Sequence, residues 1–291
     1  MKPIIALAVS LMAISSQAIA EQNSSTIYQS GTGNVGASDQ TTYGTYASHI
    51  YQSQDGDINH TFALQSSESH SQIYQVQQGV MNDGYSKQSG GQYNQGSIYQ
   101  SGSANRADTF QLQAQYSEAS IRQQGLSNKA AVYQIGGYGN IAIIQQYGSV
   151  LNAHIGQYAS TDSEAYIRQG GNYNDARILQ SGFGQMADIS QDGDGNTALI
   201  EQADSHNETW IYQDGYTNQA YISQHSWQNY AAINQHGDLN RADILQYGAG
   251  GHSAIVNQFG AMNSAVLTQS GISQTAIVTQ SGIGNQAAVS Q

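Results

Sequence analysis

Apolar and polar residues alternate along most of the chain, and the alternation restarts at a nearly fixed interval. In the clearest region, from Gln169 to Gln246, glutamine recurs every eleven residues and closes the frame Asn-x-Ala-x-Ile-x-Gln. Alternation with a period of two predicts a β-strand that presents one face to a core. A fixed interval between such strands predicts a repeat architecture.

The phased residues of this region are expected to point inward and to form continuous structural columns along the repeat axis. They are Gln169, Gln180, Gln191, Gln202, Gln213, Gln224, Gln235, Gln246, Asn174, Asn196, Asn207, Asn218, Asn229, Asn240, Ile178, Ile189, Ile200, Ile211, Ile222, Ile233 and Ile244.

The same frame extends outward to 24 units whose closing glutamines are ten to thirteen residues apart. Outside the clear region these are Gln29, Gln40, Gln52, Gln65, Gln75, Gln88, Gln100, Gln111, Gln123, Gln134, Gln146, Gln157, Gln258, Gln269, Gln280 and Gln291. Asn stands six residues before the glutamine in sixteen units, and Ala four residues before it in sixteen. The positions between them vary freely, as expected of an outward face.

We predict an all-β fold: a β-solenoid of about twelve two-stranded coils over residues 21–291, stacked in parallel as two facing sheets. The four or five residues left between strands suffice only for tight turns. An antiparallel meander with the same spacing is the alternative. It would leave one face of its sheet uncovered, so the solenoid is favoured.

The core of such a coil is thin, because each coil offers two large apolar and two small residues. Their burial is worth roughly 5 kcal/mol, less than ordering the coil costs. Stability therefore has to come from hydrogen bonds between coils, with Asn and Gln amides stacked in ladders. Identical residues in identical phase give each buried amide the partners it requires.

The first coils are expected to be the least stable. The large apolar position is occupied by Ser38, Ala63, Ser86 and Thr109 in alternate units, which places them on one sheet. On the outside of the opposite sheet, a single column is expected of Tyr28, Tyr51, Tyr74 and Tyr99. Either an adhesive stripe or stacking that supports weak coils would explain such a column, and stacking is favoured.

Residues 1–20 have the pattern of a secretory signal peptide, with Lys2, an apolar stretch and the small-residue site Ala18-Ile19-Ala20. An uncleaved anchor is the alternative, and the polar sequence that follows speaks against it. Beyond this segment the chain has no cysteine, seven basic and twenty acidic residues, a net charge of −13. That charge speaks against nucleic acid and anionic membranes as partners.

Three dinucleotide-like glycine motifs, the first at 31–36, recur as the turn of the repeat rather than before a helix, so no cofactor is expected. His225 and His236 follow consecutive glutamines and should lie on opposite sides of the coil, so no metal site is expected. Acidic residues and histidines occupy variable outward positions, so no catalytic residues and no enzyme are predicted.

Two segments resemble the start of a calcium loop, at 55–59 and 192–196, but both lack its later glycine and glutamate. Weak calcium binding at the surface stays open. Asp192 and Asp214 should lie one coil apart on one sheet, where their charges repel each other. We therefore expect mildly acidic conditions to favour assembly.

The motif Gln-x-Gly-x-x-Asn-x-Ala-x-x-x-Gln, seen from Gln191 to Gln202 and again from Gln213 and Gln280, resembles the repeat of curlins, the subunits of curli fibres. The resemblance covers nearly all of residues 21–291. It implies a secreted amyloid fibre on the bacterial surface, with roles in adhesion and biofilm matrix. It also implies self-assembly, a second curlin subunit, an outer-membrane secretion channel and periplasmic accessory proteins as partners. The resemblance fits both the major and the nucleating subunit of the fibre and does not decide between them.

The leading functional hypothesis is thus a structural fibre subunit that grows through open solenoid ends. A monomeric surface β-solenoid that acts as an adhesin or binds a ligand is the alternative, and it would need capped ends. The third hypothesis is an enzyme built on a β-helix, which would need long loops that form a cleft.

Overall fold

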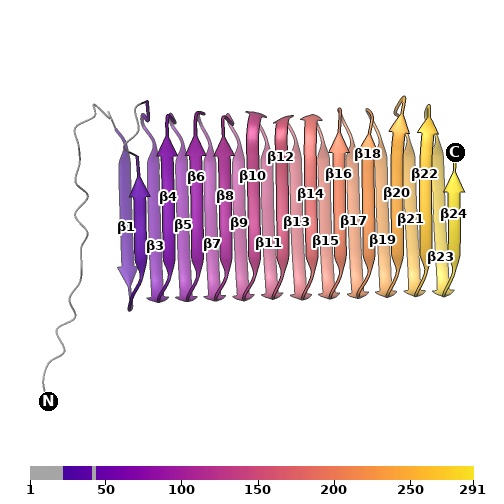
Figure 1. Ribbon diagram of the computed structural model, residues 1–291, viewed down its shortest axis with the longest axis horizontal. Helices are drawn as coiled ribbons and strands as arrows, with labels where there is room; N and C mark the ends of the chain where they lie inside the picture. Colours follow the sequence, from indigo (N-terminus) through magenta and orange to yellow (C-terminus); the bar gives the residue numbers. More distant parts are fainter. Residues whose placement is uncertain (1–21, 41–43) are drawn as a thin grey trace, which may run out of the picture.

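The computed structural model describes residues 22–40 and 44–291 (Figure 1). The expected signal peptide at 1–20 lies outside these residues. Sheet A consists of β1 (Ser24–Ser30), β3 (His49–Asp57), β5 (Gln72–Val80), β7 (Gln95–Ser103), β9 (Glu118–Leu126), β11 (Ile141–Ser149), β13 (Glu164–Asn172), β15 (Met186–Asp194), β17 (Glu208–Tyr216), β19 (Tyr230–Asp238), β21 (Ser253–Ala261) and β23 (Thr275–Ile283).

Sheet B consists of β2 (Val35–Asp39), β4 (His60–Ser66), β6 (Asp83–Ser89), β8 (Arg106–Leu112), β10 (Lys129–Tyr138), β12 (Asn152–Thr161), β14 (Asp175–Phe183), β16 (Thr197–Ala203), β18 (Gln219–His225), β20 (Arg241–Gly248), β22 (Ser264–Gly271) and β24 (Gln286–Ser290). The described residues include no helix long and apolar enough to cross a membrane.

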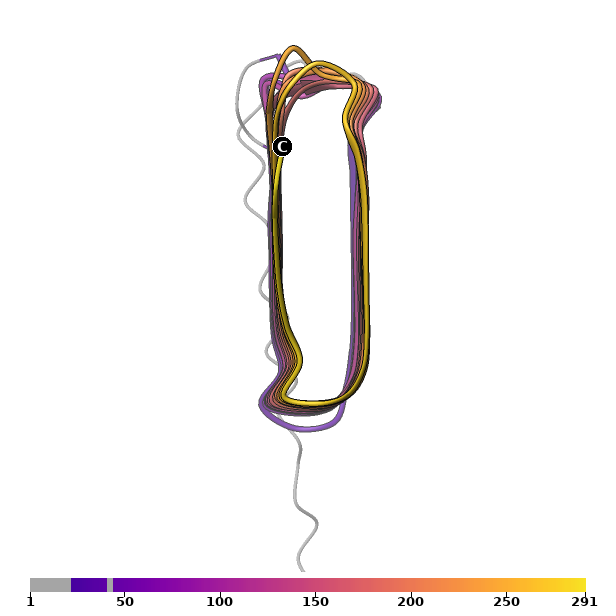
Figure 2. The same ribbon diagram turned by 90° about the vertical axis from the view of Figure 1, so that its right-hand side faces the viewer.

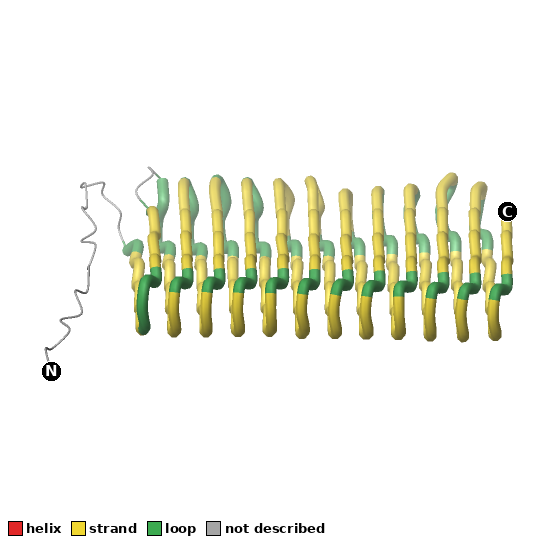
Figure 3. The backbone as a smooth tube through the Cα atoms, turned by 60° about the horizontal axis from the view of Figure 1, so that its bottom comes forward, coloured by secondary structure: helices red, strands yellow, loops and turns green. Residues whose placement is uncertain are grey.

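Each strand pairs in parallel with the strand two places along the chain, and the sheets each contain twelve strands. Viewed along the axis, one coil is a flattened loop with two straight sides (Figure 2), and short turns join the sheets along the stack (Figure 3). The predicted β-solenoid is confirmed. Because consecutive strands belong to different sheets, the antiparallel meander is excluded.

The core lies between the sheets and is filled by alternate residues of every strand. In β15, Ala187, Ile189 and Gln191 are fully buried, whereas their sequence neighbours face outward. One apolar cluster runs without a break from Ile98 to Val278.

An unbroken column of glycine runs along the C-terminal ends of the sheet A strands, where the chain turns toward sheet B. Its members have φ values between 86° and 150° and are Gly31, Gly56, Gly79, Gly102, Gly125, Gly148, Gly171, Gly193, Gly215, Gly237, Gly260 and Gly282. A Cβ on Gly193 would lie 2.2 Å from the carbonyl oxygen of Gly215 in the next coil. The close approach of stacked turns therefore demands glycine in this column. Gly182 and Gly271, which follow their glutamines in the same way, lie in sheet B instead.

The predicted phase is wrong in β3 and β5. Gln54 and Gln77 continue the column that begins at Gln29, whereas Gln52 and Gln75 stand two residues earlier. A shift by two keeps every side chain on its face, so alternation alone does not distinguish the two registers. The glycines distinguish the two registers, because a glycine stands two residues after Gln54 and after Gln77 but not after Gln52 or Gln75.

Gln52 and Gln75 consequently occupy the large apolar position, where they are fully buried. They face the column of Ser38, Ala63 and Ser86 in sheet B. Gln75 donates to the Ser86 hydroxyl over 3.0 Å. A polar filling thus replaces the apolar core in these coils and leaves Ile50, Ala63 and Ile73 as a separate small cluster. The labile first coils stay a prediction, for which this filling gives a physical reason.

The predicted tyrosine column is confirmed only in part, for the same reason: the rings of Tyr28 and Tyr51 are neighbours, with centroids 5.9 Å apart, but the four tyrosines do not share one register. Tyr51 and Tyr74 pair with each other and stack with ring centroids 4.8 Å apart, but Tyr28 pairs with Ser53. Tyr99 pairs with Val76.

The glycine column can be tested with Gly193→Ala. We expect the variant to lose more than about 2 kcal/mol of unfolding free energy, because a strained φ is combined with a backbone clash. Chemical denaturation would measure the loss. Gly195→Ala is the matched control in the same turn, since its Cβ would approach only Thr217 Oγ1, at 3.4 Å. Equal losses in both variants would contradict the packing requirement.

Candidate functional site: amide ladders and open coil ends

The closing glutamines form one hydrogen-bonded ladder in each sheet. In sheet A the Gln169 Nε2 donates to Gln191 Oε1 over 2.9 Å, and Gln191 Nε2 donates to Gln213 Oε1 over 2.8 Å. Gln213 continues the ladder to Gln235 over 2.8 Å. The sheet B ladder runs in the same way through Gln180, Gln202, Gln224 and Gln246, with distances of 2.8–3.1 Å. Each amide in these ladders exposes at most 3% of its surface.

A second hydrogen bond ties each glutamine to the opposite sheet. Gln191 Nε2 also donates to the backbone carbonyl of Asp175 over 3.1 Å, and Gln213 Nε2 to that of Thr197 over 3.0 Å. Both N–H groups and the carbonyl oxygen of the amide are therefore used, which offsets the desolvation of a buried polar group. The ladders link coil to coil and sheet to sheet at once.

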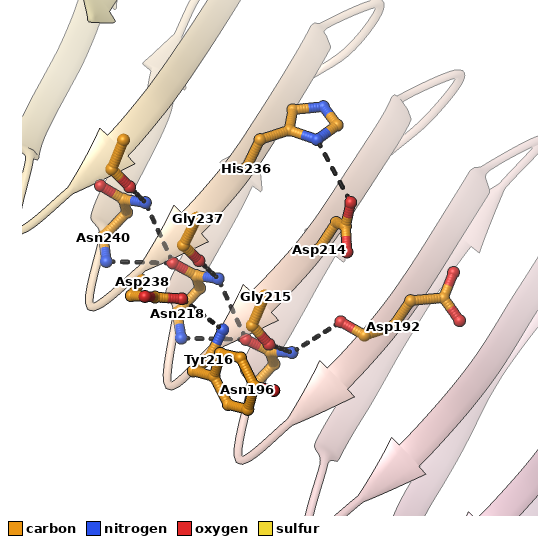
Figure 4. Close-up of polar contacts among 11 residues, drawn as sticks. Asp192, Asn196, Asp214, Gly215, Tyr216, Asn218, His236, Gly237, Asp238 and Asn240 are labelled. Carbon is orange, nitrogen blue, oxygen red and sulfur yellow. Dashed lines mark hydrogen bonds and ion pairs between the residues drawn. The ribbon is translucent and has the colours of Figure 1, made fainter. Parts of the chain in front are cut away.

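The predicted asparagines fall into two columns, one at each turn. Asn174, Asn196, Asn218 and Asn240 follow sheet A, whereas Asn207 and Asn229 follow sheet B. Figure 4 shows the first column, in which the backbone N–H of Asn218 donates to Asn196 Oδ1 over 3.0 Å.

In the column that follows sheet A, each asparagine side chain also binds the backbone carbonyl of a glycine in the next coil. Asn196 Nδ2 donates to the carbonyl of Gly215 over 3.0 Å, and Asn218 Nδ2 donates to that of Gly237 (Figure 4). The glycine column and the asparagine column therefore form one hydrogen-bonded unit, in which each asparagine amide binds a glycine carbonyl of the next coil.

The predicted isoleucines form the two apolar columns between the amides. Ile189, Ile211 and Ile233 are paired in sheet A. Those of sheet B are Ile178, Ile200, Ile222 and Ile244. None exposes more than 1% of its surface.

The glutamine ladders have one direction, since every Nε2 donates toward the C-terminal end. The first described rung of sheet A is Gln29 to Gln54, at 2.7 Å, and the last is Gln258 to Gln280, at 2.8 Å. At the C-terminal end Val289 is only partly buried, and at the other end Ile27 is 39% exposed. Within the described residues, both ends are thus open cross-sections of the core.

Outside the core, the polar groups are dispersed. Asp192 and Asp214 are paired on sheet A, as expected, and His236 Nδ1 lies 3.7 Å from Asp214 Oδ2 (Figure 4). His225 belongs to sheet B and is therefore remote from His236. Asp194, in a predicted calcium-like segment, accepts the backbone N–H of Asn172 over 2.9 Å. No group of three metal-ligating side chains occurs among the described residues.

Glu68 is a buried carboxylate that sequence reasoning missed. It lies in the turn between β4 and β5, and no part of it is exposed. Its oxygens accept hydrogen bonds from Ser71 Oγ (2.7 Å), the Gly91 backbone N–H (2.9 Å) and Asn94 Nδ2 (3.2 Å). Burial raises the pKa of Glu68, and these hydrogen bonds offset part of the rise.

Four segments of the chain match the family model of the curlin associated repeat: 160–193, 171–203, 228–260 and 240–271. These segments overlap the region from Gln169 to Gln246, where the glutamine spacing is strictly regular. No curated protein sequence matches the chain significantly.

The ladder can be tested with Gln191→Leu, which keeps the side-chain volume but leaves Gln169 Nε2 and Gln213 Oε1 without their partner. We expect a loss of about 1–3 kcal/mol for each orphaned group, measured by chemical denaturation. Gln124→Leu is the control, because Gln124 is exposed. A Gln191→Leu variant as stable as this control would show that the ladder contributes no net stability.

Glu68 should make the chain less stable as the pH rises. Its folded-state pKa lies above the ordinary 4.5, so the folded state binds the proton more tightly, and stability is lost as the pH rises from about 4.5 through the folded-state pKa. In Glu68→Gln, which stays neutral, thermal unfolding should vary less with pH.

Other buried titratable groups also contribute to the pH dependence of stability, so the slope has to be compared between variants. Burial also raises the pKa of Asp108 and of Asp188, which act in the same direction as Glu68. Burial and nearby Arg177 lower the pKa of His154, which acts in the opposite direction. Glu118→Gln, at an exposed position, is the control and should keep the wild-type slope. An unchanged slope in Glu68→Gln would refute the assignment.

Proposed function

Since the chain belongs to the curlin family, whose members are curli-type structural proteins, we propose that it is a subunit of an extracellular amyloid fibre that assembles head to tail. In this fibre the C-terminal coil of one copy binds the N-terminal coil of the next. The family consists of fibre subunits rather than enzymes, and the proposed role requires no catalysis.

The observation that carries the proposal is the complementarity of the two ends. At β23 the sheet A ladder ends in Gln280, whose Oε1 accepts from Gln258 and whose Nε2 has no further glutamine to donate to among the described residues. At β1 the ladder begins with Gln29, whose Nε2 donates to Gln54 and whose Oε1 accepts from no other described glutamine. A second copy in register would therefore extend each ladder with the correct donor and acceptor. A heterologous contact of this kind generates an open filament rather than a closed oligomer.

The apolar columns support the same contact. Val289 in β24 and Ile27 in β1 stand at the two ends, and both would be buried by an adjoining coil. The unpaired backbone edges of the end strands would also be satisfied, as in other cross-β assemblies. One contact thus continues the amide ladders and the backbone pairing of both sheets and the apolar column of sheet A, whereas in sheet B Val289 would meet the small Ser38.

The proposal extends to location and partners. Residues 1–20 would direct export, and residues 21–291 would form the repeat domain. A second curlin subunit, an outer-membrane secretion channel and periplasmic accessory proteins are partners that the family implies. The fibre would serve cell adhesion and the biofilm matrix.

Seeded growth tests the proposal. Monomer in dilute buffer should form fibres with amyloid-dye fluorescence, and preformed fragments should shorten the lag. Val289→Lys should slow elongation strongly, because an incoming copy would bury an unpaired ammonium group.

Val266→Lys is the matched control: Val266 points outward from neighbouring β22 and is 43% exposed, so its elongation should stay near wild type. Equal elongation rates in the two variants would contradict growth through the coil ends. A monomer that stays soluble with seeds would favour the monomeric adhesin instead.

A further inference from the structure

A row of aromatic rings runs along one edge of the solenoid, at or beside the turns that lead from sheet B to sheet A. Tyr46, His70, Tyr93, Tyr116 and Tyr138 follow one another, one per coil. Successive ring centroids are 4.8–5.5 Å apart. The fibre contact proposed above uses none of these residues.

Within this row, Tyr93 and Tyr116 are matched in a way that no other neighbours are. Both have the same left-handed backbone conformation, with φ of 55° and 53°. Their rings are stacked, with centroids 4.8 Å apart and planes 16° apart. The neighbour of Tyr93 on the other side is His70, which is not a phenol, and Tyr138 is tilted by 46° against Tyr116.

Both phenols are accessible to reagents in solution. Tyr93 is 43% exposed and Tyr116 is 46% exposed. Each lies in the turn before a strand of sheet A, and with ring centroids 4.8 Å apart a modest change of the side-chain torsions would bring the edges of the two rings together. Proximity of this kind converts a coupling between two molecules into a step within one.

We propose that Tyr93 and Tyr116 form a site of oxidative cross-linking, at which a haem peroxidase with hydrogen peroxide joins them as dityrosine. Each phenol loses one electron and one proton to become a phenoxyl radical, and hydrogen peroxide takes up the two electrons and two protons to give two waters. The radicals form one C–C bond between ring carbons ortho to the oxygens. The hydrogens on those carbons then move to the oxygens, so both phenols are restored.

The link would close one complete coil covalently at the border of the polar core. Tyr93 precedes β7 and Tyr116 precedes β9, and the buried polar residues Gln75 and Ser86 lie in the neighbouring strands β5 and β6. A closed loop restricts the unfolded chain, as a disulfide does. The chain has no cysteine, so tyrosine coupling would supply the covalent bond that disulfides provide in other exported proteins.

The purified chain at low concentration, treated with a haem peroxidase and hydrogen peroxide, tests the proposal. The expected result is blue dityrosine fluorescence in the monomer fraction, an intact mass lower by two hydrogens, and a linked peptide pair containing Tyr93 and Tyr116. Tyr93→Phe and Tyr116→Phe should each abolish this pair. In concentrated urea the pair should lose its preference over other tyrosines, because the stacked geometry is gone.

Tyr173→Phe is the matched control. Tyr173 has the same backbone conformation, with φ of 59°, and is 68% exposed, but it lies at the opposite turn and no ring contact to it occurs among the described residues. The link between Tyr93 and Tyr116 should form normally in this variant. Links mapped instead to Tyr51 and Tyr74, links only between molecules, or an undiminished yield of dityrosine in Tyr93→Phe would each overturn the assignment.

Discussion

The structure depends on the requirement that a buried side-chain amide finds a partner on every side. A glutamine in an apolar core is unfavourable unless its donors and its acceptor are all used. Here the copy in the previous coil, the copy in the next coil and a backbone carbonyl of the opposite sheet meet that requirement, as at Gln191. A ladder of this kind works only when many coils contain the same residue in the same phase, and this explains why the repeat is so regular.

The two turns of the coil obey different constraints. At the turn after sheet A, a glycine column and an asparagine column hold each other, because the glycine carbonyls accept from the asparagine amides. A Cβ on any member of the glycine column before Gly282 would strike the backbone of the next coil. The turn after sheet B is less constrained, and it accommodates the buried Glu68 and the exposed aromatic row.

Much of this architecture could be predicted from the sequence. A period of two within units and about eleven between them fixed the inward face, the parallel pairing and the two sheets. The phase of β3 and β5 could not be predicted from alternation, because Gln52 and Gln54 lie on the same face and differ only in register. The register could have been read from Gly56, which stands two residues after Gln54, as the column glycines do after their glutamines. Glu68 could not be found, because its burial depends on hydrogen bonds from Gly91 and Asn94 in the next coil, which are a property of the stack rather than of any unit.

The common direction of the glutamine ladders gives the rod an electrical axis. Side-chain amide dipoles that all point the same way add along the stack, with the positive end at the C-terminal coil, much as peptide dipoles add in a helix. In a head-to-tail polymer these contributions continue from one copy to the next. Such a filament would be polar along its length, with two chemically distinct tips, and growth at one tip would present a different surface to the incoming molecule than growth at the other.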